Sequence, residues 1–418
     1  MGTWNVNAKG KDENLHSWLC SDWGPNMEYA PDIVAVGFQE MVDLNAVNVA
    51  MENKSAQKSQ QWADRIQATL DDRLGGYKLI CEPKYLVGLM LCVFVRDIHV
   101  ARVRCVFSDA VGVGVMGMLG NKGGVSIRMR FYDSTICIVN SHLAAHRENV
   151  KGRNSDFNNI ATKLSFKIGP VEIGSEIMNV SLSHWLAENS SIGTLDHDIT
   201  FWMGDLNYRI VEAIDTDKII ALCQNGTIEP LRALDQLNIE RAAGRVFQGF
   251  EEGTLAFPPT YKYQPGTDLY EQRPEKKIRA PAWCDRVLWY AQDPRHANQL
   301  NYKRSELNVS DHKPVMSTFG ITFKDIVQSQ RKAVMVELQN TLKRFESKNP
   351  PSISLESLEV NFSEVRYNET LTKQVKIKNI GNAVAMFRFV PKSDEVRLIF
   401  FLFYWPFRRK MFAIFRSF

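Results

Sequence analysis

Phe201-Trp-Met-Gly-Asp-Leu-Asn-Tyr-Arg209 is an apolar run that ends at a glycine and is followed at once by Asp205 and Asn207. Alternate residues after a strand point to the same side, so the carboxylate and the carboxamide are expected to emerge together. The plainer alternative is a turn that only caps a buried strand, because Asp and Asn often bond to their own backbone. This run alone leaves both interpretations open.

The same arrangement recurs along the chain, where apolar runs meet carboxylate, amide or imidazole side chains. The further examples are Thr3–Asn7, Asp32–Glu40, Ile136–His142, Trp283–Arg286 (which precedes the apolar run Val287–Tyr290) and Val309–Val315. Turn formation alone is a poor explanation for polar residues at so many strand ends. The pattern therefore predicts one shared site built from several strand ends.

Length and composition indicate a globular protein with more than one domain. The chain has 418 residues, 44% of them hydrophobic and 23% charged, which fits a large enzyme domain plus a small module. The formal net charge of +4 is small for this length and does not by itself indicate a nucleic-acid partner. Any anionic partner is expected to meet a local cationic patch.

The cysteines indicate a reducing compartment. The chain has seven of them, widely spaced and without a Cys-x-x-Cys pair, so we expect reduced thiols in the cytosol and neither a disulfide framework nor a zinc site. No signal peptide precedes the first motif. Met1-Gly2 does not begin a myristoylation signal, because Val6 stands where that signal has Ser or Thr.

Residue patterns predict the elements of the first 322 residues. We expect strands at 32–38, 77–81, 91–95, 100–104, 125–130, 135–139 and 315–321, and helices at 54–74, 146–166, 217–223 and 230–241. Residues 167–198 lack a period and are interpreted as an insertion. The apolar segments Tyr85–Met90 and Val111–Leu119 are either packed strand edges or loops that touch acyl chains.

The pattern changes after residue 322. Phe323–Phe345 has helical spacing and is followed by Asn349-Pro-Pro351. Ser354–Phe362 and Leu371–Lys378 alternate as in an antiparallel β-sandwich, with too few strands for a complete one. The apolar run Leu398–Trp405 precedes a basic cluster and is too short to span a bilayer. We expect the incomplete module to be unstable.

The polar strand ends suit metal-assisted phosphate chemistry. Their oxygen-bearing members match the ligands of Mg²⁺, which is usually bound through one or two carboxylates and substrate phosphate. An acid beside a histidine, as in Asp311-His312, suits an imidazolium that stabilises phosphoryl charge, and Asp205 could take a proton from attacking water. The chain has no Gly-x-Ser-x-Gly, P-loop or Cys-x5-Arg motif, so a covalent route lacks an obvious nucleophile.

These motifs together resemble the inositol polyphosphate 5-phosphatase family. They are Thr3–Asn7, Phe38–Glu40, Asn140–His146, Gly204–Arg209, Pro281–Arg286 and Ser310–Val315, and they occur in the family's order across residues 1–322. The linker helix and alternating β module resemble the type II branch, in which an ASH domain follows and then a RhoGAP-like domain that this chain lacks. The boundaries expected are 1–322 for the catalytic domain with a clipped first strand, 323–350 for the linker helix, 351–395 for a partial ASH module and 396–418 for a divergent tail.

The resemblance implies an α/β DNase I-like four-layer sandwich, two packed β-sheets flanked by helices, that removes 5-phosphates from phosphoinositides with Mg²⁺. It implies Glu40 as the principal metal ligand, with Asn5, Asn7 and Asp311 near the metal. It implies Asp205 as the base, Asn207 as its positioning partner, His312 with Asp285 as the phosphate-binding pair and His142 as a scissile-phosphate contact. Contacts to the 4-phosphate would fall on Tyr208, Arg209, Lys276 and Lys262.

The resemblance also implies a place and partners: a lipid substrate on endosomal, Golgi or plasma membranes, and a Rab-type GTPase at the linker helix and second module. No nucleic-acid partner is expected. Two alternatives stay open, an abasic-site nuclease of the same fold and a weakly active trafficking adaptor. Arg147 and Arg153 are expected at the surface, and Lys276, Lys277 and Arg279 form a charge run that is otherwise typical of a solvated loop.

Overall fold

The structure is a computed structural model that describes residues 1–9, 13–22, 30–42, 52–73, 76–114, 122–167, 191–350, 352–357, 361, 371–382, 385, 398–402 and 410–417. The chain divides into two compact units, Met1–Asp325 and Ile326–Phe418, each with its own sheets. Among the described residues, no helix combines the length and apolar composition that crossing a bilayer requires.

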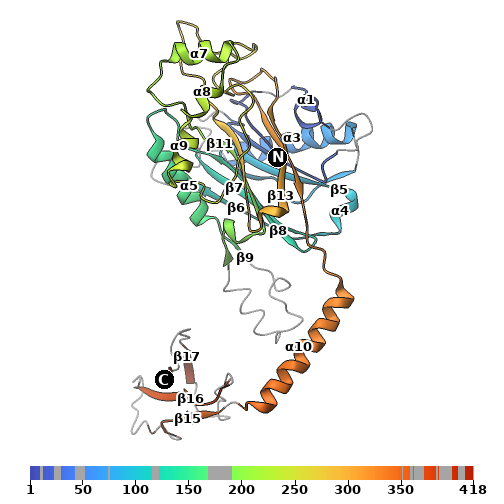
Figure 1. The fold of residues 1–418 in the computed structure, drawn as a ribbon, viewed down its shortest axis with the longest axis vertical. Coiled ribbons are helices and arrows are strands. Elements are labelled where there is room, and N and C mark those ends of the chain that lie inside the picture. Colours follow the sequence, from blue (N-terminus) through green and yellow to red (C-terminus); the bar gives the residue numbers. More distant parts are fainter. Residues whose placement is uncertain are drawn as a thin grey trace. The chain divides into compact units, whose positions relative to one another are not determined.

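Two sheets form the centre of the first unit (Figure 1). The larger has the order β13 (Ala297–Arg304), β14 (Val315–Ile321), β1 (Gly2–Asn5), β2 (Ile33–Gln39), β5 (Leu89–Arg96) and β3 (Tyr77–Leu79), with β4 (Lys84–Leu86) also paired to β5. The smaller has the order β12 (Asp285–Ala291), β11 (Ile199–Asp205), β8 (Ser134–His142), β7 (Gly123–Phe131) and β6 (Val103–Gly112). Two pairs are parallel, β1 with β2 and β8 with β11. The strands of each parallel pair therefore end side by side.

The main core lies between the two sheets. Ala35, Leu91 and Val93 of the larger sheet share one buried cluster with Ile138 and Phe201 of the smaller. The neighbouring residues of the same strands belong to other clusters, because successive side chains of a strand point to opposite faces. Both faces of each sheet are therefore buried, which requires covering layers on the outside.

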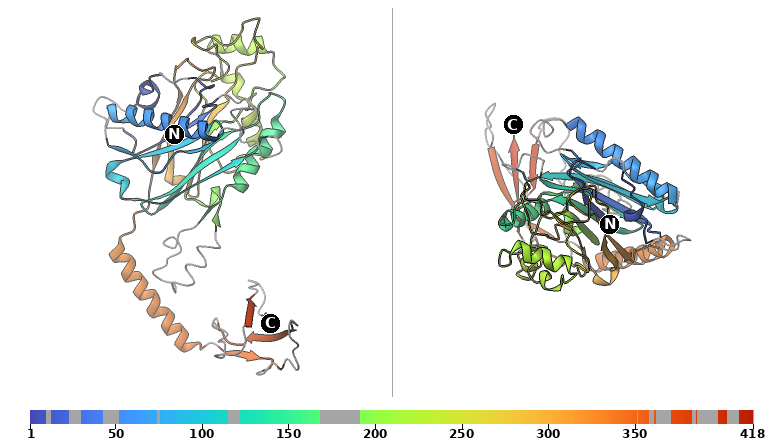
Figure 2. Two further views of the ribbon diagram at one scale, coloured as in Figure 1. Left: turned by 180° about the vertical axis from the view of Figure 1, so that it is seen from behind. Right: turned by 90° about the horizontal axis from the view of Figure 1, so that it is seen from above.

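Helices supply those outer layers. Trp18 of α1 (His16–Leu19) and Trp62 of α3 (Glu52–Arg73) pack with Phe38 of β2, the ring centroids of Phe38 and Trp62 being 4.4 Å apart. Phe157 of α5 (Val150–Lys163) packs on Trp202 of β11 at 4.9 Å, together with α9 (Gln236–Ala242). The view from above in Figure 2 separates α3 (blue) from α5 (green) on opposite sides of the sheets. The result is the expected four-layer α/β sandwich.

Short elements complete the first unit. They are α4 (Asp97–Val100), β9 (Phe166–Lys167), β10 (Ser191–Ile192), η3 (Thr194–Asp196), α7 (Thr216–Gln224), α8 (Glu229–Arg232) and η4 (Pro294–His296). Most of the expected insertion, residues 168–190, lies outside the described part of the chain. Of the two interpretations of Tyr85–Met90, the packed strand edge fits better, because the segment lies in the antiparallel pair of β4 and β5 and Leu89 and Met90 are fully buried. Of Val111–Leu119, residues 115–119 also lie outside the described residues.

Three elements differ from the sequence-based expectation. The strand expected at 100–104 begins at Val103, because α4 occupies the preceding residues. β13 was not expected, and its polar side chains explain why. The helix expected at 230–241 is broken into α8 and α9 at Asp235, which caps α9 by accepting from Asn238 N at 3.0 Å.

The break at Asp235 also serves a buried ion cluster. The fully buried Arg286 of β12 donates from Nη1 to Asp235 Oδ1 at 2.9 Å and from Nε to Glu252 Oε1 at 2.7 Å. Burying a guanidinium is costly unless carboxylates pair with it, and here two of them do so. Arg286 thereby fastens β12 to the start of α9.

The second unit contains α10 (Gln328–Lys348) and a sheet of β15 (Ile353–Leu355), β16 (Leu371–Asn379), β18 (Lys410–Ser417) and β17 (Leu398–Leu402), in that order. The sequence did not predict β17 and β18, which are antiparallel partners. Parts of the expected module and tail, including 362–370, 386–397 and 403–409, lie outside the described residues. The domain boundaries and the instability of this module stay predictions.

Candidate active site

Strand register brings the catalytic candidates of the smaller sheet into one row. Asp205, the last residue of β11, is paired with His142 of β8 on one side and with Asp285 of β12 on the other. The close approach of β11 and β8 requires the preceding Gly204, because a Cβ there would lie 2.0 Å from Ser141 O. On the larger sheet, Asn5 pairs with Gln39, which directly precedes Glu40.

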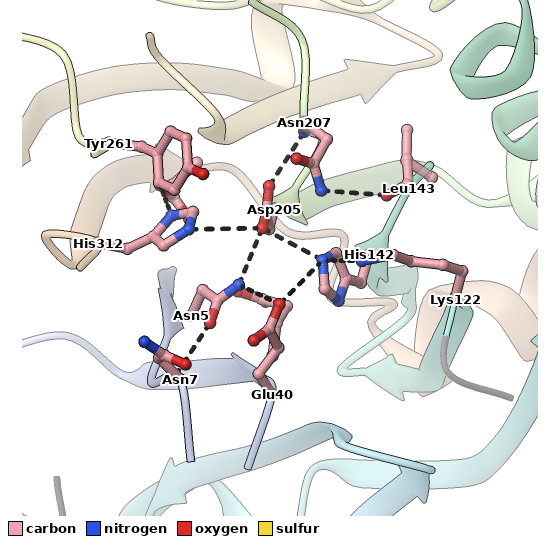
Figure 3. A network of polar contacts seen from close by, with 12 residues as sticks. Asn5, Asn7, Glu40, Lys122, His142, Leu143, Asp205, Asn207, Tyr261 and His312 are labelled. Atoms are coloured by element: carbon pink, nitrogen blue, oxygen red, sulfur yellow. Dashed lines mark hydrogen bonds and ion pairs between the residues drawn. The ribbon is translucent and has the colours of Figure 1, made fainter. Parts of the chain in front are cut away.

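Asp205 lies at the centre of a polar network (Figure 3). Asn5 Nδ2 donates to Asp205 Oδ2 at 2.9 Å and to Glu40 Oε1 at 3.2 Å, so one amide bridges the two carboxylates. Asn207 N donates to Asp205 Oδ1 at 3.1 Å, and Asn207 Nδ2 donates to Leu143 O at 3.1 Å. The carboxylate is therefore fixed from both sheets while being 1% exposed.

The two acids of this network stay ionised. Burial alone would raise the pKa of Asp205, but the nearby His142, His312 and Lys122 lower it far below its ordinary range. Burial would likewise raise the pKa of Glu40, but His142 and Lys122 lower it, and the net result is a lowered pKa. Both carboxylates can therefore bind a cation or accept a proton at neutral pH.

His312 and Asp285 form a buried acid–imidazole pair. His312 Nδ1 lies 2.9 Å from Asp285 Oδ2, which also accepts from Thr260 Oγ1 at 2.6 Å. Burial would lower the pKa of His312, but Asp285 and Asp205 raise it to about 9. His312 Nε2 lies 3.9 Å from Asp205 Oδ2, and the Tyr261 ring lies 4.5 Å from the imidazole. The pair therefore presents an imidazolium beside the central carboxylate.

His142 faces the same carboxylates and contacts a lysine that sequence reasoning missed. His142 Nε2 lies 3.3 Å from Asp205 Oδ2 and 3.7 Å from Glu40 Oε1, and it contacts Lys122 Nζ (Figure 3). Burial and the Lys122 ammonium lower the pKa of His142, while burial lowers the pKa of Lys122. Lys122 directly precedes Gly123, which is paired with His142 across β7 and β8. Only this strand pairing places the lysine at the site.

The donors around Glu40 fit a divalent cation. The Glu40 side chain is 30% exposed, and the Asn5 amide donates to both Glu40 and Asp205. Two carboxylates therefore lie close together, and their oxygens are the kind of ligand that Mg²⁺ prefers. Asn7 contributes its backbone N–H to Asn5 Oδ1 at 3.0 Å, and Asp311 Oδ2 lies 3.8 Å from Lys262 Nζ.

A second set, Asp205, Asp285 and His312, also has ligand atoms within 4.8 Å of one another. In that set the Asp285–His312 hydrogen bond already occupies one acid and one ring nitrogen, so we favour the Glu40 side as the cation site.

Three residues at the site have strained backbone. Asn7, Glu40 and Asn207 have φ angles of 45°, 53° and 57°, in the left-handed region that residues other than glycine seldom adopt. Such strain persists only where the surrounding structure holds it, and it is typical of functional sites. The three strained positions therefore coincide with predicted metal-binding and positioning residues.

The predicted 4-phosphate contacts separate into two groups. Tyr208 is fully buried in the core under α5, and its hydroxyl donates to Asn154 Oδ1 at 2.8 Å, so a phosphate contact by Tyr208 gains no support. The Arg209 guanidinium lies over the Tyr261 ring at 4.3 Å and donates to Asn207 O at 3.1 Å. Packing of Tyr208 into the core is what turns Arg209 toward the site.

A cationic cavity of about 240 Å³ adjoins Arg209. It is lined by His146, Arg147, Glu148, Arg209, Glu212, Thr216, Lys277, Ile278, Arg279 and Ala280. Lys277 lines this cavity, whereas the predicted Lys276 is exposed and is not among the lining residues. The predicted charge run therefore lines the cavity with Lys277 and Arg279 and not with Lys276.

The expectation of a surface position is wrong for Arg153, whereas Arg147 is half-buried and lines the cavity. Arg153 is fully buried and donates to His146 O at 2.5 Å and to Gln236 Oε1 at 2.7 Å. Arg147 donates to Ile210 O at 2.7 Å. Loop carbonyls after β8 and β11 need donors that the sheets do not supply, and these two arginines provide them.

Residues 2–318 match the family described as Endonuclease/Exonuclease/phosphatase family 2, and residues 355–403 match the Inositol polyphosphate 5-phosphatase OCRL-like ASH domain.

The chain is 36% identical to the Type II inositol 1,4,5-trisphosphate 5-phosphatase of Mus musculus over 94% of its length, and it spans 37% of that relative. It is 35% identical to the Type I inositol polyphosphate 5-phosphatase 8 of Arabidopsis thaliana, covering 79% of this chain and 72% of the relative.

Two solved structures show what the fold does and does not imply. The inositol polyphosphate 5-phosphatase domain of SPsynaptojanin, in complex with inositol (1,4)-bisphosphate and a calcium ion, has a TM-score of 0.65 and 28% identity over 83% of this chain and 90% of its own. Cimex nitrophorin has a TM-score of 0.54 and 20% identity over 77% of this chain and 97% of its own. The nitrophorin shares the fold alone, so the chemistry must be argued from the site.

Proposed function

Because this chain belongs to the endonuclease/exonuclease/phosphatase family and, within it, to the inositol polyphosphate 5-phosphatases of the type II branch, we propose that it hydrolyses the 5-phosphate of inositol phosphates and phosphoinositides. The central position of Asp205 carries the proposal. Its carboxylate joins the Asn5–Glu40 side of the site to the His312–Asp285 side. Metal-assisted attack of water on a phosphate ester needs those two sides around one base.

In this proposal Asp205 takes the proton from the attacking water. Its pKa is lowered far below the ordinary range, so the carboxylate is in the ionised form that a general base requires. The backbone N–H of Asn207 and the amide of Asn5 hold its two oxygens, which fixes the direction of the base. Such orientation lowers the barrier because the reacting groups meet without further reorganisation.

His312 stabilises the negative charge of the phosphoryl group. With a pKa raised to about 9, it is an imidazolium at neutral pH and can donate from Nε2 to a phosphoryl oxygen. Asp285 holds the ring through Nδ1 and leaves Nε2 free to face the site. His142 lies on the opposite side of Asp205 and can contact the same phosphate.

Glu40 would hold Mg²⁺, with Asn5, Asn7 and Asp311 nearby. When bound, this cation supplies Lewis-acid stabilisation of phosphoryl charge. Glu40 is suited to the role because its carboxylate is ionised and partly exposed, so it remains accessible to a cation from solvent. Asn5 links Glu40 to Asp205 by donating to both carboxylates.

The cavity beside Arg209 is suited to a second phosphate of the substrate. Arg209, Lys277 and Arg279 supply positive charge there, and Arg guanidinium groups recognise phosphate oxygens by paired hydrogen bonds. Contacts to a phosphate next to the reacting one would position the ring as well as bind it. Lys262 and Lys276 remain predicted contributors to the same recognition.

We extend the proposal to lipid substrates such as phosphatidylinositol 4,5-bisphosphate and 3,4,5-trisphosphate, at cytoplasmic membrane surfaces of endosomes, Golgi or the plasma membrane. Only the half-buried start of the β4–β5 hairpin, Tyr85–Val87, supports it as a candidate acyl-chain contact, because Leu89 and Met90 are fully buried in the core. A Rab-type GTPase is the proposed partner of α10 and the second module. The exposed apolar side chains Val334, Leu338, Leu342 and Phe345 of α10 support that part.

Phosphate release decides between these functions. Purified protein would be assayed with Mg²⁺ or with EDTA on inositol 1,4,5-trisphosphate, on phosphatidylinositol 4,5-bisphosphate vesicles and on abasic DNA. We expect Mg²⁺-dependent release from the inositol substrates and no cleavage of DNA.

Asp205→Asn should lower turnover by about 10² to 10⁴ while the protein stays folded. Turnover by this variant within a few-fold of the parent would show that Asp205 is not the base.

A further inference from the structure

Tyr261 is a buried aromatic residue that contacts both the His312 imidazole and the wall of the cationic cavity. Its backbone is paired on two sides, because isolated β-bridges join Tyr261 to Ala282 and to His312. Tyr261 N donates to Ala282 O at 3.2 Å, and Lys313 N donates to O of the preceding Thr260 at 2.9 Å. The residue is 3% exposed. The backbone on both sides therefore fixes the place from which the ring projects.

The ring of Tyr261 packs against two cationic groups of the site. The centroids of the Tyr261 and His312 rings lie 4.5 Å apart (Figure 3), and the Arg209 guanidinium carbon lies over the Tyr261 ring at 4.3 Å. The face of an aromatic ring attracts cations, and this attraction is strongest where water is excluded. The ring therefore helps to hold the imidazole that faces the reacting phosphate and an arginine of the cavity.

The hydroxyl of Tyr261 holds a third cation, at the wall of the cavity. Arg279 Nη1 donates to Tyr261 Oη at 2.5 Å, and Arg279 lines the cavity together with Arg209. In the part of the chain that the structure describes, this hydroxyl is the one hydrogen-bond partner of the Arg279 guanidinium. The direction of that guanidinium therefore depends on Tyr261.

Uncharged partners leave the positive charge of both arginines available to an anion. The Arg209 guanidinium donates to two oxygens of Asn207, a carbonyl and an amide, and the Arg279 guanidinium donates to a hydroxyl. None of these acceptors offsets the charge as a carboxylate would. Four cationic side chains line the cavity against two acidic ones, Glu148 and Glu212. A phosphate group, with up to about two negative charges, suits such a cavity.

We propose that Tyr261 is a positioning residue that sets the preference for a substrate with a second phosphate next to the one that reacts. The assignment rests on the proposed function. The ring orients His312 and Arg209, and the hydroxyl orients Arg279, so one side chain links the groups that face the two phosphates. Tyr261 keeps its proton and takes no part in bond making. Its effect is to hold the cations at a separation that matches neighbouring phosphates.

Two substrates that differ by one phosphate test this assignment. Inositol 1,4,5-trisphosphate and inositol 1,5-bisphosphate differ by the 4-phosphate alone, and kcat/KM would be measured on both with Mg²⁺. Tyr261→Phe removes the hydroxyl and keeps the ring, Arg279→Met removes the guanidinium, and a double variant combines the two changes. Tyr77→Phe is the matched control, because Tyr77 is also buried and its hydroxyl donates to Pro31 O in the edge strand β3, away from the site.

We expect Tyr261→Phe to lower kcat/KM on the trisphosphate by about tenfold, as for the loss of one hydrogen bond to a charged group, and on the bisphosphate by less than about threefold. Arg279→Met should lower the value on the trisphosphate further, because the charge itself is lost. The double variant should match Arg279→Met within about twofold, because the hydroxyl acts through that guanidinium. Tyr77→Phe should match the parent on both substrates.

Equal losses of Tyr261→Phe on the two substrates, or no loss on either, would overturn the assignment, because a merely structural role does not distinguish the substrates. So would additive losses in the double variant, or a Tyr261→Phe protein that shows no cooperative thermal unfolding. If the parent releases no phosphate from either compound, the proposed function fails. Calorimetry then tests Tyr261 separately: weaker binding of the trisphosphate alone supports the assignment, and equal weakening of both compounds refutes it.

Discussion

Replacing Asp285 with Asn should make the activity of this protein sensitive to pH in a range where the parent is not. Asp285 Oδ2 lies 2.9 Å from His312 Nδ1 and is a main cause of the raised pKa of that imidazole. The amide keeps the size and a hydrogen-bond acceptor, but it removes the charge. Asp205 still raises the pKa of His312, but without the charge of Asp285 that pKa should fall from about 9 toward the ordinary value of 6.5, which sets the full size of the effect.

The magnitude follows from the two pKa values. With a pKa of about 9, about 97% of His312 is imidazolium at pH 7.5, against about 9% for the ordinary value of 6.5. At pH 6 the same comparison gives about 99.9% and about 76%, a loss of about 1.3-fold, whereas at pH 8.5 the loss is roughly 75-fold. The defect of Asp285→Asn should therefore grow steeply as the pH rises.

The assay is kcat/KM on inositol 1,4,5-trisphosphate between pH 6 and 9, with the exposed Asp217→Asn as control. NMR titration of the His312 ring would follow its pKa directly. A defect of the same size at pH 6 and pH 8.5, or a His312 pKa that stays near 9 in the variant, would refute the reasoning. Asp285 would then only orient the ring.

Three further predictions follow from the site and the second unit. Glu40→Gln should weaken Mg²⁺ binding measured by calorimetry, and raised Mg²⁺ should partly restore turnover; a complete lack of rescue would point to another ligand. Lys277→Ala should reduce hydrolysis of a 4,5-bisphosphate more than that of a 5-monophosphate, whereas Lys276→Ala should have the smaller effect because Lys276 does not line the cavity; the reverse order would restore Lys276 as the main contact. A chain ending at Lys348 should keep full turnover of soluble substrates and aggregate less in light scattering, and a separate cooperative unfolding step in the 418-residue chain would show instead that the second unit is a stable module.

The sequence predicted the features of the site that are local. Asp205, Asn207 and Glu40 follow apolar runs directly, so their position at strand ends could be seen from spacing alone. Lys122 could not be found in this way, because its place depends on the pairing of β7 with β8 and not on its neighbours in sequence. The pairs of strands that bring His142, Asp205 and Asp285 into one row are equally non-local.

Arg153 and Tyr208 show a second limit. Arg153 is polar and lies in a polar helix, which indicates the surface, yet it is buried because distant loop carbonyls need its donors. Tyr208 lies inside a motif of the site, yet its ring packs into the core and its neighbour Arg209 faces the site. A motif indicates where a site is, but only the packing decides which of its members face inward.

The row formed by His142, Asp205 and Asp285 has a consequence for how this protein can vary. Neighbouring strands hold these side chains at one level, so a slip of one residue in β11 would move Asp205 by about 3.3 Å and turn it to the opposite face. Insertions in the surrounding loops leave that alignment untouched. We therefore expect the site to tolerate changes in loop length and surface charge, and a change in strand length at this level to abolish the activity in one step.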